Sequence, residues 1–450
     1  MNSHAGAWEL GVYWRLFSAC CPSYLKTGVQ SLQLLPAKQL KRFYSSCMPN
    51  LTALTFDKKT EVKPDRLIKP VSFNLLHFFN LLLFLSVQVI FKIMQNILVR
   101  HPNDLTIDWA QRVVNNHSAH IVVSSVNIIS VEIGTTTRVR VKVKHNQPSL
   151  LPEQWFVKLP SLAWQARLIT ALPRLLHTEV RFYNEVAPSV SVTVPDLLAA
   201  QSRFGKGATL VLTDVSSCGA LLGNVGDALT FSQATQVVEE LARFHACFWK
   251  KERLNHAYPW LAGPVRRLED FLGTAMAVPL MKRGLHKAGD LVPSKLHARA
   301  IHYARHRRQA MRFLTDAPQT LIHHDCHPGN LFWNQSQPGL LDWQLVRFGE
   351  GISDIAYFLS TALEPETRRR HEARLITIYT QCLENNGIEN INATVLLQRY
   401  RAHLVYPFEA MLVTLAIGGM MNLESNHELI RRTAAAIEDL DAFAAIPPIK

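Results

Sequence analysis

The sequence has few cysteines, and none of them stands in a recognisable metal-binding or disulfide pattern. Its 450 residues include seven, of which Cys20 and Cys21 are adjacent and the others are widely spread. This arrangement excludes a disulfide framework and favours a reducing compartment. His323, His324 and His327 lie too close together along one loop to form a recognised zinc set. We therefore expect no structural zinc.

Acidic residues are scarce in the first fifth of the chain. Residues 1–93 hold 11 Lys and Arg against 4 Asp and Glu, whereas residues 94–450 hold 37 against 31. Residues 1–50 contain one acid, Glu9, and several serines, which is also the profile of an organelle transit peptide. The basic residues of the main body are scattered rather than gathered with aromatics into a stripe, so we expect no nucleic-acid partner.

The N-terminal region also lacks an apolar run that is securely long enough to span a bilayer. Residues 75–91 form a 17-residue apolar stretch interrupted by polar side chains, at the lower edge of the spanning length. Three interpretations of residues 1–93 stay open. They form a membrane anchor that acts through residues 75–91, they contain an amphipathic or buried helix, or they are an upstream artefact and Met94 is the true start.

The remainder of the chain is apolar enough to build a large folded core. The sequence is 48% hydrophobic and 18% charged, which excludes a disordered chain, and its length allows more than one domain. Val139, Val141 and Val143 alternate with basic residues, which predicts a half-buried strand. Strands are expected at 120–133, 138–145, 154–159, 191–201 and 209–215, with a helix at 173–186.

A Ser- and Gly-rich segment at residues 216–226 marks the expected boundary between two lobes. After it, apolar residues recur at helical spacing, which predicts helices at 232–250, 294–315, 351–386 and 393–443. We therefore divide the chain into an extension at 1–93, a strand-rich lobe at 94–215 and a helical lobe at 216–450. The fold class is α+β.

The sharpest local signal is a polar segment between apolar anchors in the last third of the chain. Asp325 and Asn330 are five residues apart, and Asp342 follows twelve residues later, after a short apolar run. This is the order and spacing of the kinase catalytic loop and its metal-binding carboxylate. Phosphoryl transfer needs a positioned hydroxyl and divalent metal ions on the phosphates. Asp325 fits the role of base, and Asn330 and Asp342 fit as Mg²⁺ ligands.

These segments resemble the aminoglycoside phosphotransferase and choline kinase superfamily, and most closely its ecdysteroid-kinase-like branch. The firmest parts of the resemblance are residues 321–330, 341–344 and 354–359, and it covers about residues 133–440. It implies a bilobal protein-kinase-like fold, with a small antiparallel sheet in the first lobe and a larger, mostly helical second lobe. It also implies ATP, Mg²⁺ and a small-molecule hydroxyl substrate, and thus a cytoplasmic location for the kinase-like part.

The same resemblance assigns further residues. Lys158 would hold the nucleotide phosphates and Glu179 would orient it, while Gly134 stands in the turn that would cover the phosphates. Asp354 would support the catalytic loop. Two features depart from the family pattern: His324 replaces a glycine, and the turn has the single glycine Gly134.

Two functions therefore compete. The first is an ATP-dependent small-molecule kinase, which transfers the γ-phosphate to a hydroxyl. The alternative is a catalytically weak or inactive kinase-like protein that binds a nucleotide or another ligand. The sequence leaves the acceptor open, although the net charge of +6 on residues 94–450 mildly disfavours a polycationic one.

Overall fold

The structure, a computed structural model, describes residues 96–164, 174–250 and 257–447. Residues 1–95, including the apolar stretch at 75–91, lie outside this set, so the three interpretations of the extension remain predictions. Within the described ranges, no helix is long and apolar enough to cross a bilayer. Lys92–Asn116 and Val122–Lys450 form one compact unit, and the elements described below lie in it.

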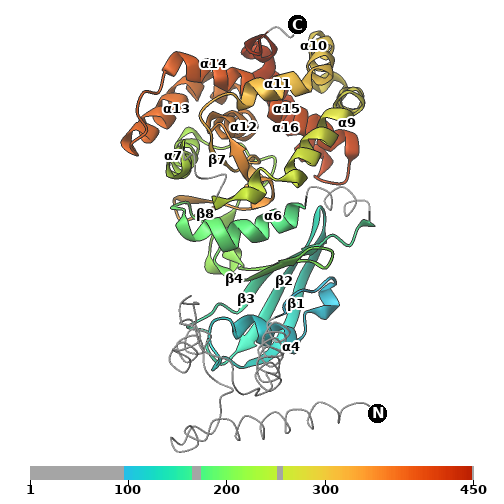
Figure 1. The fold of residues 1–450 in the computed structure, drawn as a ribbon, viewed down its shortest axis with the longest axis vertical. Helices are drawn as coiled ribbons and strands as arrows, with labels where there is room; N and C mark the ends of the chain where they lie inside the picture. The colour runs from blue at the N-terminus through green and yellow to red at the C-terminus, as the bar shows by residue number, and fades with distance from the viewer. Residues whose placement is uncertain (1–95, 165–173, 251–256, 448–450) are drawn as a thin grey trace, which may run out of the picture. The chain divides into compact units, whose positions relative to one another are not determined.

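Five antiparallel strands form one sheet in the order β1-β2-β3-β5-β4 (Figure 1). The strands are β1 (Val123–Ile133), β2 (Thr136–His145), β3 (Gln154–Pro160), β4 (Leu197–Arg203) and β5 (Gly207–Thr213). The alternation predicted in β2 is confirmed, because Val139, Val141 and Val143 are fully buried. The strand expected at 191–201 is wrong in its first half, since Pro195 lacks the N–H that a ladder requires.

The two faces of the sheet have different partners. Trp155 and Lys158 are three residues apart in β3, so their side chains point to opposite faces. Trp155 packs edge-on against Trp109 of α4 (Ile107–Val114), with ring centroids 6.0 Å apart. Lys158 instead contacts Glu179 of α6 (Leu175–Arg181). The first face therefore closes a small core of its own, and the second faces α6.

α6 is shorter than the helix expected at 173–186. Arg174 precedes it in the left-handed conformation, at φ 52°, and Pro173, the expected first residue, lies outside the described residues. After Arg181 the helix widens into a π-helical turn, η4 (Phe182–Val186). Single π-helical turns within helices are frequent at functional sites. Here the turn carries the fully buried Phe182.

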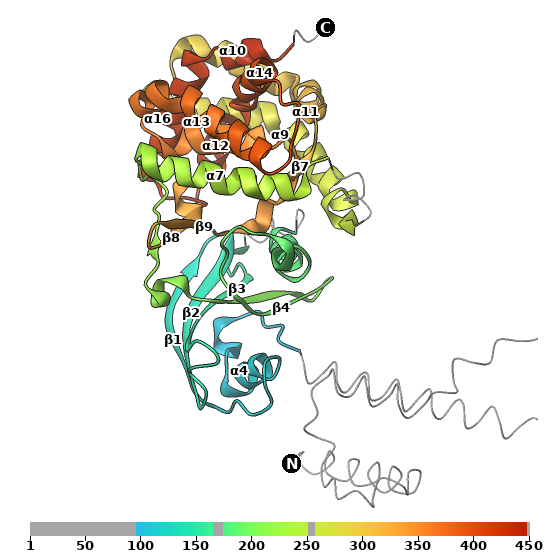
Figure 2. The ribbon, with the colours of Figure 1, turned by 90° about the vertical axis from the view of Figure 1, so that its left-hand side faces the viewer.

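The rest of the chain is mostly helical, and α7 runs along one side of the helices (Figure 2). The helices are α7 (Phe231–Phe248), α9 (Pro264–Ala288), α10 (Ser294–Arg305), α11 (Arg307–Thr315), α12 (Ile352–Ala362), α13 (Pro365–Asn385), α14 (Ala393–His403), α15 (Val405–Ile417) and α16 (Leu423–Asp439). The expected helix at 351–386 is two helices, because Pro365 starts a new one. The sequence analysis missed α9, whose apolar residues do not keep to one face and which contains Pro279.

Two small sheets frame the segment that carries the predicted loop. β7 (Thr320–Ile322) pairs with β10 (Arg347–Gly349), and β8 (Leu331–Asn334) pairs with β6 (Leu221–Leu222) and β9 (Gln337–Leu340). Residues 323–330, which we call the Asp325 loop, connect β7 to β8. Asp342 lies two residues after the end of β9. The predicted loop and the predicted aspartate are therefore held by neighbouring strand ends. The predicted lobe limits, 94–215 and 216–450, remain predictions.

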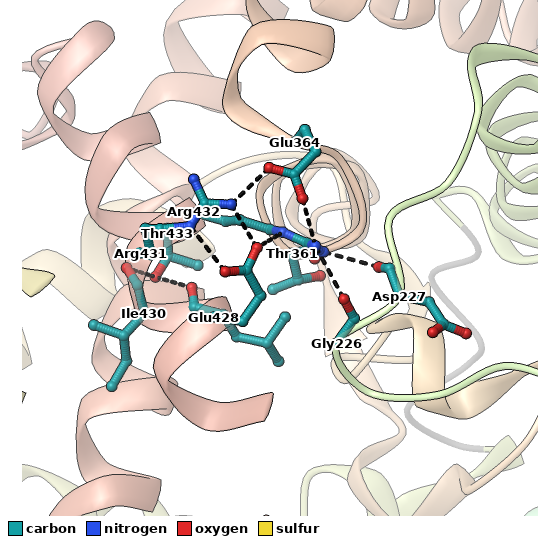
Figure 3. Close-up of polar contacts among 10 residues, drawn as sticks. Gly226, Asp227, Thr361, Glu364, Glu428, Ile430, Arg431, Arg432 and Thr433 are labelled. Atoms are coloured by element: carbon teal, nitrogen blue, oxygen red, sulfur yellow. Dashed lines mark hydrogen bonds and ion pairs between the residues drawn. The ribbon is translucent and has the colours of Figure 1, made fainter. Parts of the chain in front are cut away.

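A buried arginine joins the segment after the sheet to the last helices (Figure 3). The side chain of Arg432, in α16, is 3% exposed. It donates to carboxylates of Glu364 and Glu428 and to the backbone carbonyls of Gly226, Asp227 and Thr361, at 2.6–3.0 Å. One guanidinium thus donates hydrogen bonds to acceptors in three separate segments of the chain.

We expect Arg432→Met to lower the free energy of unfolding by about 3–5 kcal/mol, because it breaks the ion pairs of a buried guanidinium and leaves the carbonyls of Gly226, Asp227 and Thr361 without this donor. Urea denaturation measures the change. Arg431→Met is the matched control, since Arg431 binds the same two glutamates but its side chain is 42% exposed. Its loss should cost less than about 1 kcal/mol. Equal losses in the two variants would contradict this account.

Candidate active site

A buried carboxylate fixes the start of the Asp325 loop. Asp354, in the first turn of α12, accepts hydrogen bonds from the backbone N–H groups of His323 (2.7 Å) and His324 (2.8 Å). The ring of His245 lies on the same carboxylate, at 3.2 Å, and its other nitrogen is 2.9 Å from the hydroxyl of Tyr379. Asp354 and His245 are fully buried. The sequence analysis assigned this supporting position to Asp354.

His323 connects the loop to the strand end before Asp342. Its Nδ1 accepts from the backbone N–H of Asp325, at 3.3 Å, so its Nε2 carries the proton that is donated to the carbonyl of Leu341, at 2.8 Å. The ring also contacts that of Trp343, with centroids 4.6 Å apart. This side chain therefore holds the two halves of the predicted site together.

Asp325 presents a carboxylate that is held at both oxygens. Its Oδ2 accepts from the amide of Asn330, at 3.0 Å, and its Oδ1 accepts from the hydroxyl of Tyr357, at 2.7 Å. The amide of Asn330 also donates to the backbone carbonyl of Asp325. The side chain remains 25% exposed, and each oxygen keeps a lone pair for a further donor. The geometry leaves it able to receive a hydroxyl proton.

Asp342 sits in a strained turn that aromatic packing stabilises. Its backbone has φ 59° and ψ 72°, a left-handed conformation that few residues other than glycine adopt. The next residue, Trp343, is fully buried and stacks on Phe182, with centroids 3.9 Å apart. Phe244 packs edge-on against the same ring. These contacts hold the turn, and the Asp342 carboxylate lies 3.3 Å from the ammonium of Lys158.

Lys158 and Glu179 form a buried ion pair. The Lys158 ammonium donates to the two carboxylate oxygens of Glu179 at 2.8 and 3.0 Å, and both side chains are at most 5% exposed. Burial raises the pKa of Glu179 to about 7, an effect that Lys158 opposes and Asp342 strengthens. Burial would lower the pKa of Lys158, but the charges of Asp342 and Glu179 raise it, so the ammonium stays charged at neutral pH.

Lys158 also lowers the pKa of Asp342. Burial alone would raise the pKa of Asp342, but the charge of Lys158 and its hydrogen bond lower it below its ordinary value. His323 and Arg138 act in the same direction. Asp342 is therefore an anion at neutral pH, and an ammonium stands beside it.

The donor atoms at the site fit a magnesium ion. The Oδ1 atom of Asp342 is buried, with the Lys158 ammonium 3.3 Å away. The amide nitrogen of Asn330 points to Asp325, so its carbonyl oxygen is the group left to bind a ligand. A carboxylate and an amide oxygen are hard ligands of the kind that Mg²⁺ binds, usually with waters and substrate phosphates. The described residues include no group of three or more His, Cys, Asp or Glu side chains suited to a metal.

Five of the six predicted site residues have side-chain contacts with one another, in two separate groups. Asp325 contacts Asn330, and Lys158 contacts Glu179 and Asp342. The sixth, Gly134, has no hydrogen bond or ion pair with these side chains in the described part of the chain. Its turn is tied to the end of β3, because the hydroxyl of Ser161 donates to the Gly134 carbonyl at 2.6 Å.

Sequence reasoning missed the functional position of Tyr357. This residue is three places after Asp354 in α12, so the two side chains share one helix face, and that face meets the Asp325 loop. The spacing was a usable signal, because a tyrosine one turn after the supporting aspartate would reach the same loop. It supplies the hydroxyl that holds Asp325.

His324 adopts a strained backbone conformation that glycine would adopt more easily. Its φ is 70°, which explains why a glycine would suit this place. The ring stacks on that of Tyr406, with centroids 3.9 Å apart, and its Nε2 is 3.2 Å from a guanidinium nitrogen of Arg347. Burial and the charge of Arg347 hold the pKa of His324 well below its usual range. The imidazole is therefore neutral, and its Nε2 lone pair accepts from Arg347.

Glu350, two residues before the start of α12, is itself part of a buried ion cluster. Glu350 accepts hydrogen bonds from Arg399 at 2.8 Å and lies 2.7 Å from the ring of His403. Burial would raise the pKa of Glu350, but the contacts with His403 and Arg399 lower it. The cluster anchors the end of α12 that carries Asp354.

We expect Glu350→Gln to destabilise the protein by about 2–3 kcal/mol at neutral pH. The folded-state pKa of Glu350 lies below the unfolded value, so its contribution is complete above the unfolded pKa and is lost as pH falls through the folded one. The gap between variant and parent in urea denaturation should thus shrink at acid pH. Glu366→Gln, at an exposed site, is the control, and a pH-independent gap would contradict the assignment.

Comparison with known proteins places the chain in a family. Residues 133–391, more than half of the chain, match the model of the ecdysteroid kinase-like family. The chain belongs to this family. The resemblance inferred from the sequence is thereby confirmed, and so is the fold class, a bilobal kinase-like fold with a five-stranded antiparallel sheet and a mostly helical remainder. The chain is related to small-molecule kinases.

Several solved structures align with the chain at low identity. Choline kinase from Cryptosporidium parvum is 11% identical over 73% of this chain and 92% of its own, with a TM-score of 0.45. Ethanolamine kinase from Plasmodium vivax is 12% identical over 75% and 89%, with a TM-score of 0.42. The GDP complex of aminoglycoside 2'-phosphotransferase-IIIa is 12% identical over 75% and 99%, with a TM-score of 0.44. No curated protein matches the chain.

Proposed function

We propose that the protein is an ATP-dependent kinase that phosphorylates a hydroxyl group of a small molecule. The observation that carries the proposal is the ion pair between Lys158 and Asp342, which brings the ammonium from the sheet to within 3.3 Å of the carboxylate that follows the Asp325 loop. Family membership supports the same class of reaction. A cytoplasmic location of residues 94–450 is part of the proposal.

In this function each side chain has one task. Lys158, oriented by Glu179, binds the phosphates of the nucleotide, and Asp325 orients the acceptor hydroxyl and takes its proton. The hydroxyl oxygen forms a bond to the γ-phosphorus, the bond to the β-phosphate oxygen breaks, and ADP leaves with that electron pair. Asn330 and Asp342 would hold Mg²⁺, which neutralises phosphate charge when bound. We place Gly134 over the phosphates, where backbone N–H groups of its turn would donate.

The direct test is a phosphorylation screen. The full chain is incubated with Mg²⁺, ATP labelled at the γ-phosphate and a library of hydroxyl compounds, and products are detected by mass. The proposal expects transfer of the label to at least one alcohol and loss of transfer on chelation of the metal. Tight binding of Mg-ATP without any phosphorylated product would favour the alternative, an inactive kinase-like binding protein.

The alternative is supported by two features, the strained His324 in place of glycine and the turn with the single glycine Gly134. The complete set of Asp325, Asn330 and Asp342 argues against it, because the residues that hold the metal and the hydroxyl are all present. We therefore retain the kinase as the better supported function.

A further inference from the structure

A large cavity adjoins the Asp325 loop on the side of the helices. Its volume is about 1210 Å³, and His324, the residue before Asp325, is part of its wall. Phe271, Met311 and Phe348 supply apolar surface, and Tyr406 lines it beside His324. Small-molecule sites usually measure about 300–1,000 Å³ and are mainly apolar. The cavity therefore has room for a bulky apolar body next to the proposed base.

The charged part of the cavity wall is strongly basic. Seven Lys and Arg side chains line it, against two acids, Asp270 and Glu350. Both acids are already occupied, because Asp270 pairs with Arg347 at 3.1 Å and Glu350 pairs with Arg399 and His403. The wall offers a ligand almost entirely positive charge.

Only some of these cations have acidic partners. Arg266, Arg307 and Arg347 are paired, with Glu269, Glu409 and Asp270. The other four lie at exposed positions, and in the described ranges none of them forms an ion pair: Lys250, Arg267, Arg308 and Arg312. An excess of four positive charges thus remains on one wall, which a bound anion would balance.

Two of the unpaired cations lie close enough on one helix to repel each other. Arg308 and Arg312 are one turn apart on α11 and both face the cavity, an arrangement in which like charges destabilise a helix. Deeper in the wall, burial and the charge of Arg347 lower the pKa of Arg266. A bound anion would reduce the repulsion between these positive charges. Unfavourable local arrangements of this kind are found mainly at functional sites.

We propose that the acceptor is an anion: a molecule with an apolar body, a hydroxyl group and a carboxylate, sulfate or phosphate that α11 binds. The inference deepens the proposed function and rests on it. The cavity connects α11 to His324, so a ligand whose acidic group lies at Arg308 and Arg312 can direct its hydroxyl toward the Asp325 loop. An amine-bearing acceptor would meet charge of its own sign.

Matched probes on one alkyl chain test the sign of the charge. Isothermal titration of the full chain compares ω-hydroxydodecanoate and ω-hydroxydodecyl sulfate with the neutral ω-hydroxydodecanamide and the cationic ω-aminododecanol. We expect each anionic probe to bind at least about tenfold more tightly than the amide, and the amine to bind most weakly. The preference should decrease with added salt. Equal binding of all four probes, or preference for the amine, would overturn the inference.

Variants connect the preference to α11. Arg308→Glu with Arg312→Glu should abolish the anion preference, and the milder change of both residues to Gln should reduce it. Arg370→Glu is the matched control, because Arg370 is an exposed arginine on α13 that does not line the cavity. An unchanged preference in the Glu double variant would overturn the assignment to α11.

The outcome separates this inference from the function on which it rests. Anion preference without phosphoryl transfer to any alcohol would support the binding site and overturn the proposed kinase. Phosphoryl transfer to neutral or cationic alcohols as efficient as to anionic ones would support the kinase and overturn the anionic acceptor.

Discussion

Asp325→Asn should lower kcat by roughly two to four orders of magnitude and leave nucleotide affinity nearly unchanged. The amide keeps the size of the carboxylate and can still contact Tyr357 and Asn330, but it cannot take the hydroxyl proton. The measurement is single-turnover transfer of labelled phosphate, with Mg-ATP binding followed separately by titration. Separate readouts are needed because a loss of binding would imitate a loss of chemistry.

The control for this change is Asp316→Asn, an exposed aspartate after α11. It should behave as the parent in both assays. Full turnover in Asp325→Asn would remove the base assignment, and an equal loss of nucleotide binding would show that the residue acts on the phosphates instead.

Asp342→Asn should act on binding as well as on turnover. We expect affinity for Mg-ATP to fall by at least about a hundredfold, since even residues that only orient metal ligands are worth about ten- to a hundredfold. The variant also removes the carboxylate that lies 3.3 Å from Lys158, so the ammonium loses one of its two anionic partners. Titration of Mg²⁺ at fixed ATP, with nucleotide binding as the readout, measures the change.

Affinity for ATP in the absence of metal is the internal control for Asp342→Asn. It should not fall, because Lys158 is then freer to meet the phosphates. A variant that loses metal-free ATP binding to the same extent as Mg-ATP binding would show that Asp342 acts on the fold of the turn rather than on the metal.

The sequence predicted most of what local chemistry determines. The alternation of Val139, Val141 and Val143 predicted a buried strand face, and the interval between Asp325 and Asn330 predicted that one loop holds both, as the contact between their side chains shows. These features depend on residues close together along the chain. Their geometry follows from strand and turn periodicity alone.

Features that depend on tertiary packing could not be predicted in the same way. The helix α9 has no clear apolar face, because several of its large apolar side chains are exposed, among them Leu268, Phe271 and Met276. The π-helical turn at Phe182 is explained by its stacking on Trp343, more than 150 residues later. The basic wall of the cavity is likewise assembled from α9, α11 and β10, whose arginines are scattered in the sequence.

The segment formed by α6 and η4 contacts both sides of the proposed site. Glu179 holds Lys158, and Phe182, on the next turn, stacks on the residue after Asp342. One short stretch of helix therefore sets the position of the cation and of the anion that stand on either side of the proposed phosphate position. A substitution that shifts this stretch would alter both at once, so under the proposed function we expect nucleotide affinity to depend on residues that do not contact the nucleotide.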